Sequence, residues 1–182
     1  MIAPTLETDR LIIRAFRNTD AELWQSWDVD PEVQVYMPEP VNLPQDITQQ
    51  YQYIRECEAE QDGYYWSVET KDGVTVGTIS LTDINSYHMT AEIGIVIGNK
   101  EYWGKGIATE AMDAVVNYAF SNLDIERISA ETEAENLGVS KVLLKCGFVH
   151  DGTFESARVK NGQRITVRHY GAIKSSWTKT VL

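Results

Sequence analysis

EIGIVIGNKEYWGKGIATEA, residues 92–111, joins an apolar strand through a polar turn to a helix. The turn contains Gly104-Lys105-Gly106, and the helical pattern begins directly behind it. The first backbone N–H groups of a helix have no intrahelical partner and lie at the positive end of its dipole, so they attract anions. Glycines at 104 and 106 leave room for a ligand to approach these donors. The segment therefore predicts a strand, a turn and a helix with a phosphate site.

Two common nucleotide-binding motifs do not fit this segment. A P-loop has four residues between its first glycine and Gly-Lys-Ser/Thr. Here five residues separate Gly98 from Gly104, and Gly106 stands where the hydroxyl residue should be. The dinucleotide fingerprint needs a glycine in place of Thr109 and a first glycine directly after the strand. A nucleotide-dependent kinase or dehydrogenase is therefore disfavoured. A turn that binds nothing is the simplest alternative, but it would not need two glycines.

The composition indicates one folded domain over residues 1–182, with 43% apolar residues, five Trp and nine Tyr. The N-terminal MIAPTLETDR lacks the basic and apolar regions of a signal peptide. No window approaches the roughly 18 consecutive apolar residues of a membrane span, so we expect a cytoplasmic protein that does not bind membranes. The net charge of −11 argues against nucleic-acid binding, which needs clustered Lys and Arg. It is compatible with a cationic acceptor, or with solubility alone.

Cysteine and histidine predict neither a disulfide nor a metal site. Cys57 and Cys146 lie on predicted helical segments without a CxxC pattern, so we expect free thiols. His88, His150 and His169 are scattered along the chain and suggest no metal cluster.

Periodicity and turn residues predict the remaining elements. The Asn161-Gly162 pair is a strong hairpin signal, and Thr19 or Asp20 is expected to cap the first helix. We expect strands at residues 11–16, 65–70, 74–81, 91–97, 127–132, 148–159 and 164–173, with helices from 19 or 20, at 46–61, at 106–122 and at 137–145; turns and short helical pieces follow Pro31, Pro38, Pro40 and Pro44. This order predicts a three-layer α/β domain whose mostly antiparallel, mixed sheet contains one central βαβ step.

With this order, the segment YWGKGIATEA, residues 102–111, resembles the pyrophosphate-binding turn of the GNAT superfamily of N-acetyltransferases. A second marker is Glu135-Asn136 followed by KCGF at residues 145–148, which is similar to the family's N-x-x-S…K-x-G-F segment. Trp103, where most members have Gln or Arg, is typical of the group related to ribosomal-protein N-terminal acetyltransferases. The resemblance covers nearly the whole chain. It implies a single domain with the acyl-CoA N-acyltransferase fold, in which two central strands splay apart.

The resemblance also implies that acetyl-CoA is the cosubstrate and lies between the splayed strands, with no metal. Where two strands part, free backbone groups can meet the two amides of pantetheine. The residues expected to contact the cosubstrate are Ile95, Val96 and Ile97 on the strand, Trp103, Gly104, Lys105, Gly106, Ile107, Ala108 and Thr109 at the turn, and Asn136. Asn136 would contact the pantetheine arm or the acceptor, cap a helix, or do both. A solvated turn lysine is an equal alternative for Lys105, and a structural bulge is an alternative for Gly94.

Acetyl transfer to an amine requires the neutral amine and therefore a base. Glu92 is the candidate base, because it shares a strand face with Gly94 and Val96; a solvated strand carboxylate is the alternative. Asp83 is a weaker candidate. The N–H of Val96 or of a neighbouring residue is the candidate donor to the oxyanion.

A general acid is not evident in the sequence. Leu143 occupies the position at which many members have tyrosine, and Val139 replaces the serine of the ribosomal-protein-like group, with Ser140 one position late. Arg158 stands near the position of a carboxylate that some relatives carry. The thiol of CoA is acidic enough for solvent to complete the step.

The resulting hypothesis is an acetyl-CoA-dependent N-acetyltransferase that acts on a primary amine by direct transfer in a ternary complex. The acceptor is a protein N-terminus if the cleft is open, or a small-molecule amine if the pocket is closed. Trp24, Trp27, Tyr36 and Tyr53 fall in the half of the chain that shapes the acceptor side, although most are expected in the core. A non-catalytic acyl-CoA-binding or sensing module is the alternative. Monomer and homodimer both remain open.

Overall fold

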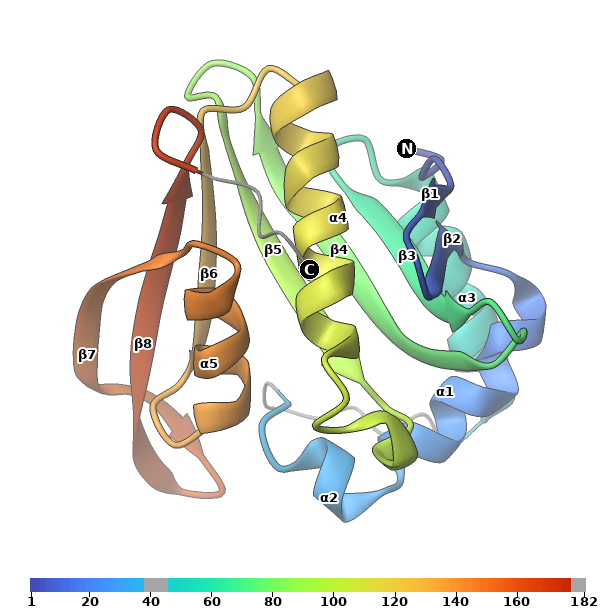
Figure 1. Ribbon diagram of the computed structural model, residues 1–182. Coiled ribbons are helices and arrows are strands. Elements are labelled where there is room, and N and C mark those ends of the chain that lie inside the picture. The colour runs from blue at the N-terminus through green and yellow to red at the C-terminus, as the bar shows by residue number, and fades with distance from the viewer. Residues whose placement is uncertain (38–45, 178–182) are drawn as a thin grey trace.

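The computed structural model describes residues 1–37 and 46–177 (Figure 1). Within these residues, eight strands form one sheet in the order β1-β2-β3-β4-β5-β6-β8-β7, with helices on both of its faces. The strands are β1 (Leu6–Glu7), β2 (Leu11–Ala15), β3 (Tyr64–Thr70), β4 (Thr75–Asn85), β5 (Thr90–Ile97), β6 (Arg127–Glu133), β7 (Val149–Lys160) and β8 (Gln163–Ile173). The helices are α1 (Ala21–Asp28), α2 (Pro31–Gln34), α3 (Ile47–Ala59), α4 (Ile107–Asn122) and α5 (Leu137–Lys145), with 3-10 turns at Asn18–Asp20 and Lys100–Tyr102. The predicted α/β class and mixed sheet are confirmed.

Two apolar layers form because successive side chains of a strand point to opposite faces of the sheet. Trp66 and Ile93 belong to the larger core, which α4 and α5 cover. Tyr65 and Val96 pack instead against a smaller core built from α1 and α3. The apolar face predicted for α4 is buried and consists of Ile107, Ala111, Val115 and Ala119.

The central strands β5 and β6 run parallel and are joined through α4, which crosses the front of the sheet (Figure 1). Among the described strands, every other neighbouring pair is antiparallel. The β5–β6 pairing covers only Thr90–Glu92 and 127–129. Beyond it, β5 stays paired with β4 to Ile97, and β6 stays paired with β8 to Glu133. The two strands therefore splay apart, as predicted.

Two details of the N-terminal region differ from the prediction. A two-residue strand, β1, precedes the first predicted strand and pairs with β2. Helix α1 begins directly after Asp20, but the Asp20 carboxylate does not cap it. It accepts hydrogen bonds from the Arg14 guanidinium at 2.8 and 2.9 Å and from the Ser67 hydroxyl at 2.7 Å. A buried charged partner thus outcompetes the local cap. Pro38, Pro40 and Pro44 lie outside the described residues.

Both cysteines are buried free thiols, as predicted. Of the helices within residues 1–37 and 46–177, none combines the length and hydropathy needed to cross a membrane.

Candidate active site

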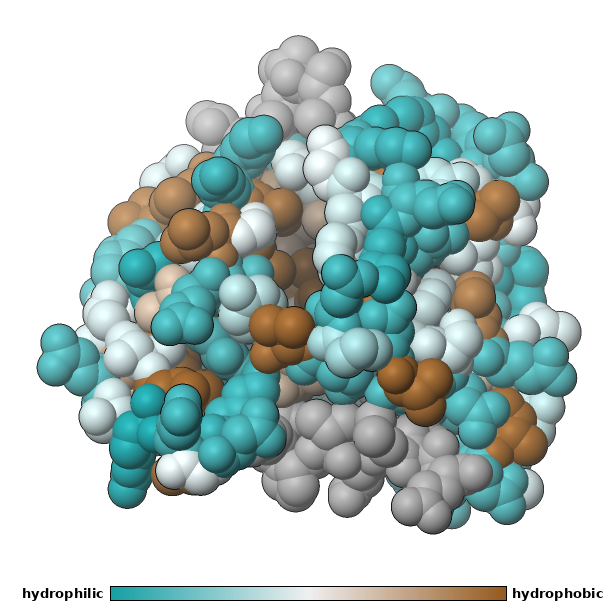
Figure 2. All heavy atoms as spheres, turned by 90° about the horizontal axis from the view of Figure 1, so that it is seen from below, coloured by the Kyte–Doolittle hydropathy of each residue, from teal (hydrophilic) through white to brown (hydrophobic). Residues whose placement is uncertain are grey.

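The opening between β5 and β6 exposes strand backbone at the place predicted for the cosubstrate. Among the strands that the structure describes, none pairs with the β6-facing edge of β5 from Ile93 to Ile97. Ile95, Val96 and Ile97 are each half-buried. Figure 2, which looks at the end of the molecule where these strands part, shows a hollow with hydrophobic atoms inside it. The predicted backbone segment is therefore reachable from this end.

The glycine turn lies between the end of β5 and the start of α4. Gly104 and Gly106 have φ angles of +72° and +79°, a region that glycine adopts without strain. Of the atoms in residues 1–37 and 46–177, none lies within 4 Å of a Cβ built on Gly104, and the Arg10 guanidinium alone, at 3.5 Å, lies within that distance of one built on Gly106. The space above the turn is therefore open to a ligand.

The predicted residues of this turn divide by burial. Gly104, Lys105 and Gly106 are exposed, whereas the side chains of Ile107 and Thr109 are buried. At the first turn of α4, residues 107–109 can therefore present chiefly their backbone N–H groups, which have no acceptor inside the helix. Lys105 places its ammonium 5.2 Å from the centre of the Tyr102 ring. This geometry suits an anion held by main-chain donors.

An ion pair behind the turn was not predicted from the sequence. Glu110 is 3% exposed, and its carboxylate accepts hydrogen bonds from the Arg10 side chain at 2.6 Å, the Arg10 backbone N–H at 3.0 Å and the Thr8 hydroxyl at 2.5 Å. Arg10 also donates to the Lys105 carbonyl oxygen at 2.9 Å. Burial alone would raise the pKa of Glu110, but the bonds from Thr8 and Arg10 outweigh it and hold this pKa below its ordinary value.

Trp103 connects the turn to the end of β5. Its indole N–H donates to the carbonyl oxygen of Ile97 at 2.6 Å, while the side chain remains 45% exposed. One backbone acceptor predicted for the cosubstrate is therefore already occupied, and Trp103 positions the turn relative to the strand.

Asn136 follows the end of β6, on the opposite side of the opening. Its side-chain oxygen accepts from the Val139 N–H at 3.2 Å, which makes Asn136 the N-cap of α5. No hydrogen bond within the described chain uses its Nδ2 atom. The amide can therefore cap the helix and still donate to a ligand.

Glu92 is the last β5 residue paired with β6, so it lies where the strands begin to part. Burial, together with the carboxylates of Glu131 and Asp83, raises the pKa of Glu92 above its ordinary value; Arg158 and His169 act in the opposite direction. Arg158 and His169 both contact Glu131. A carboxylate whose pKa is raised toward neutrality is better matched to proton transfer at physiological pH.

The structure offers no acid at the positions where relatives carry hydroxyl groups. Leu143 is fully buried in the core, and Val139 is apolar. The Ser140 hydroxyl, which is nearly buried, donates to the Asn136 carbonyl oxygen at 3.0 Å. The Tyr36 hydroxyl lies nearby and donates to the Glu135 carbonyl oxygen at 3.3 Å.

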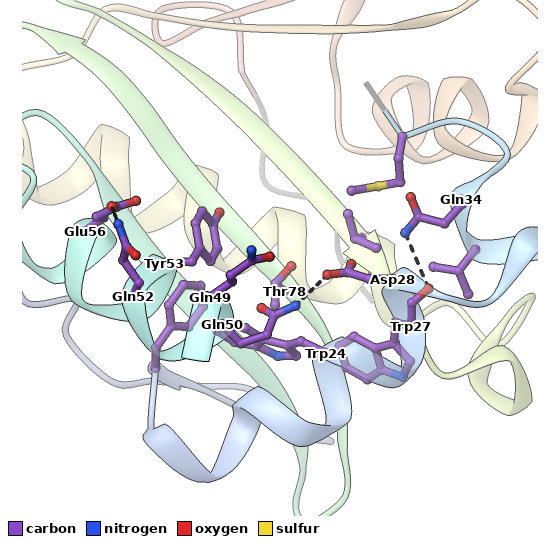
Figure 3. Close-up of a pocket in the computed structure, with 14 residues that line it drawn as sticks. Trp24, Trp27, Asp28, Gln34, Gln49, Gln50, Gln52, Tyr53, Glu56 and Thr78 are labelled. Carbon is purple, nitrogen blue, oxygen red and sulfur yellow. Dashed lines mark hydrogen bonds between the residues drawn. The ribbon is translucent and has the colours of Figure 1, made fainter. Parts of the chain in front are cut away.

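A cavity of about 740 Å³ lies on the α1 and α3 side of the sheet (Figure 3). Val96 and Thr78, which face each other across β5 and β4, form part of its floor. It is therefore adjacent to the splayed part of β5. The other lining residues are Phe16, Trp24, Trp27, Asp28, Val33, Gln34, Met37, Gln49, Gln50, Gln52, Tyr53 and Glu56.

The aromatic residues assigned to the acceptor side divide in the structure. Trp24, Trp27 and Tyr53 line the cavity, and both tryptophans also belong to the core between α1 and α3. Tyr36 does not line it. Sequence reasoning missed Asp28, whose Oδ2 accepts from Gln50 Nε2 at 2.6 Å (Figure 3). Four glutamines and two carboxylates of α1 to α3 line the cavity. These polar residues were the available signal in the sequence, but only the packing of the helices brings them together.

Comparisons with known proteins agree with this geometry. The domain family described as acetyltransferase (GNAT) domain matches residues 10–149. An uncharacterized N-acetyltransferase of Bacillus subtilis, YoaA, is 32% identical over 94% of this chain and 97% of its own length.

Two further comparisons concern the predicted ribosomal-protein N-terminal acetyltransferase-like group and the fold. A putative ribosomal N-acetyltransferase of the same organism, YdaF, is 32% identical over 58% of this chain and 57% of its own length, in agreement with the predicted group. The solved structure of Vibrio cholerae spermidine N-acetyltransferase, in complex with CoA and spermine, superposes with a TM-score of 0.83 at 22% identity, over 93% of this chain and 98% of that one. The chain therefore belongs to the acetyltransferase (GNAT) domain family and is an N-acetyltransferase.

Proposed function

We propose that this protein transfers the acetyl group of acetyl-CoA directly to a primary amine within a ternary complex. The observation that carries the proposal is the juxtaposition of two features: the edge of β5 that faces β6 at 93–97, where the ladder with β6 has ended, and the open glycine turn at 104–106. The turn would hold the pyrophosphate through backbone N–H groups. The strand would hold the pantetheine amides, and Asn136 would donate from the opposite side of the opening.

The acetyl thioester would then lie beside Val96, between the strand opening and the cavity. An amine entering from the cavity attacks the thioester carbonyl carbon; a C–N bond forms, and the C–S bond breaks when the intermediate collapses. The Val96 N–H is our candidate donor to the oxyanion, because a preorganised donor there stabilises charge as it develops. The nitrogen, which becomes positively charged on attack, loses one proton to water or to the base, and the departing thiolate of CoA takes up one proton from solvent.

Glu92 is our candidate base, and it would act through water. It shares its strand face with Val96 but lies four residues earlier, which is roughly 13 Å along an extended strand. A direct proton transfer across that distance is impossible, and one water is too short to span it, so a chain of several water molecules would carry the proton. The raised pKa of Glu92 supports this role.

An acceptor screen tests the proposal. The protein is incubated with acetyl-CoA and a panel of protein N-terminal peptides, amino sugars, amino acids and polyamines, with CoA release and acetylated products measured by mass spectrometry. We expect at least one primary amine to be acetylated. A non-catalytic acyl-CoA-binding module, which the apolar Leu143 and Val139 suggest, would bind acetyl-CoA without releasing CoA in the presence of any amine.

A further inference from the structure

The charged groups that line the cavity are of one sign among the residues that the structure describes. Within residues 1–37 and 46–177, the charged lining residues are Asp28 and Glu56, and no Lys, Arg or His of these ranges contributes a side chain. Glu56 is exposed and accepts from Gln52 Nε2 at 2.7 Å. Asp28 is half-buried and takes part in no ion pair with the residues that the structure describes. The cavity is therefore electrostatically unbalanced in favour of a cation.

The position of Asp28 is unfavourable for the protein alone. It is the last residue of α1, where the negative end of the helix dipole opposes a carboxylate. Burial raises its pKa, against the hydrogen bond from Gln50, which lowers it. Gln50 is a neutral partner, 3% exposed, and it fixes the orientation of the carboxylate without neutralising it. A partly buried carboxylate has lost part of its hydration, and an opposite charge would offset this loss.

The walls next to Asp28 are also suited to a cation. Trp24 and Trp27 line the cavity on the side of Asp28, and Tyr53 lines it farther along, toward Gln52 and Glu56 (Figure 3). The ring centres of Trp24 and Tyr53 are 6.3 Å apart in an edge-to-face arrangement. Aromatic faces attract ammonium groups, and they also accommodate the methylene groups between two amines. The volume of about 740 Å³ is that of a small-molecule pocket.

A cation at Asp28 would have to differ from the reacting nitrogen. The reacting amine must be neutral when it attacks, whereas a nearby carboxylate stabilises the protonated form and raises the amine pKa. A second, non-reacting ammonium on the same molecule can pair with Asp28 and strengthen binding without raising the pKa of the amine that reacts.

We infer that this cavity selects aliphatic diamines and longer polyamines, with Asp28 binding an ammonium group remote from the nitrogen that is acetylated. Acceptors that carry a carboxylate or phosphate in that place are rejected, because no cation in the cavity offsets their charge. This inference rests on the proposed function and names its acceptor class.

Three acceptors with the same four-carbon chain test the inference: 1,4-diaminobutane, 1-aminobutane and 4-aminobutanoate. We expect kcat/KM to be at least roughly tenfold higher for the diamine than for the monoamine, because a hydrogen bond between two charged groups is among the stronger interactions available. The aminobutanoate should react more slowly than either. Equal values for all three, or a preference for the aminobutanoate, would overturn the inference.

Variants of Asp28 assign the preference to this residue. Asp28→Asn should abolish the preference for the diamine, so that the ratio of kcat/KM for the diamine to that for the monoamine, both measured with this variant, falls to about 1, and Asp28→Glu should restore part of the ratio. Glu22→Gln is the matched control, since Glu22 is exposed on the same helix and does not line the cavity. A preference that persists in Asp28→Asn would contradict the assignment.

The comparison of the three acceptors uses the wild-type protein alone. The inference therefore stays testable even if Asp28→Asn does not fold. A parallel calorimetric titration with acetyl-CoA distinguishes failure of the proposed acetyltransferase function from failure of the inferred preference for diamines. If acetyl-CoA binds and the three amines react equally, only the inference fails. If no amine of any class reacts, the proposed function fails and the inference fails with it.

Discussion

Arg10 and Glu110, which are 100 residues apart in the chain, form an ion pair at 2.6 Å directly behind the glycine turn. Through this pair and the bond from Arg10 to the Lys105 carbonyl, the segment before β2 supports the first turn of α4. The donors that would bind a pyrophosphate are thereby fixed before a ligand arrives. Preorganisation of this kind increases affinity by reducing the cost of ordering the site.

Breaking this pair should weaken both the fold and the cosubstrate site. Glu110→Gln is expected to lower the free energy of unfolding by about 2 kcal/mol, because it removes charge-assisted hydrogen bonds to a buried carboxylate. The Kd for acetyl-CoA should rise severalfold. Chemical denaturation and calorimetric titration measure the two effects. Glu126→Gln, at an exposed carboxylate before β6, is the control and should change neither.

The same pair gives a pH dependence of stability. The folded-state pKa of Glu110 lies below its ordinary value of 4.5. Its stabilisation is therefore fully present above that value and is lost as the pH falls through the folded-state pKa. The difference in unfolding free energy between wild type and Glu110→Gln should be constant near neutral pH and shrink on acidification below about 4.5. A difference that grows on acidification would contradict the role assigned to this carboxylate.

The ionisation of Glu92 should determine how kcat falls on the acid side of the pH–rate profile, which is called the acid limb below. A base works only when ionised, so kcat should fall as the pH drops through the raised pKa of Glu92, above the ordinary value of 4.5. Glu92→Gln should reduce kcat by roughly 10²–10⁴-fold and remove that limb. Two neighbours provide sharper tests. Asp83→Asn should shift the limb to lower pH, and Arg158→Gln should shift it to higher pH, because these groups raise and lower the pKa of Glu92 respectively. If the acid limb of kcat lies at the same pH in both variants as in the wild type, Glu92 is not the base.

Asn136 can be tested for a ligand role separately from its cap. Asn136→Ser retains a side-chain oxygen for the N-cap of α5 but lacks the amide donor, whereas Asn136→Ala lacks both. The Ala variant should lose about 1 kcal/mol of stability, and the Ser variant much less. If Asn136 donates to the cosubstrate or the acceptor, both variants should raise KM to a similar extent. A wild-type KM in Asn136→Ser would show that Asn136 caps α5 but contacts neither the cosubstrate nor the acceptor.

Much of the fold could be predicted because the local signals agree with the tertiary structure. Helix α5 spans the predicted residues, and the Asn161-Gly162 turn joins β7 to β8 as expected. The exceptions depend on distant partners. Asp20 does not cap α1 because Arg14 and Ser67 bind its carboxylate, and β1 exists only because it pairs with β2.

The site divides in the same way. Glycines with positive φ and a strand next to a helix leave a local pattern, so the turn could be located from the sequence. Two other contacts leave no local pattern in the sequence, because each joins elements that only the folded structure brings together. They are the contact of Arg10 with Glu110 and that of Asp28 with Gln50.

The most direct test of the account is a calorimetric titration of acetyl-CoA into wild type, Gly106→Trp and Gly73→Trp. Gly106 and Gly73 have similar φ angles, +79° and +83°, so both variants carry the same backbone strain, but Gly73 lies in the β3–β4 turn. We predict saturable one-site binding to wild type and Gly73→Trp, and loss of binding in Gly106→Trp. Absence of binding to the wild type, or undiminished binding to Gly106→Trp, would contradict the assignment of this turn as the cosubstrate site.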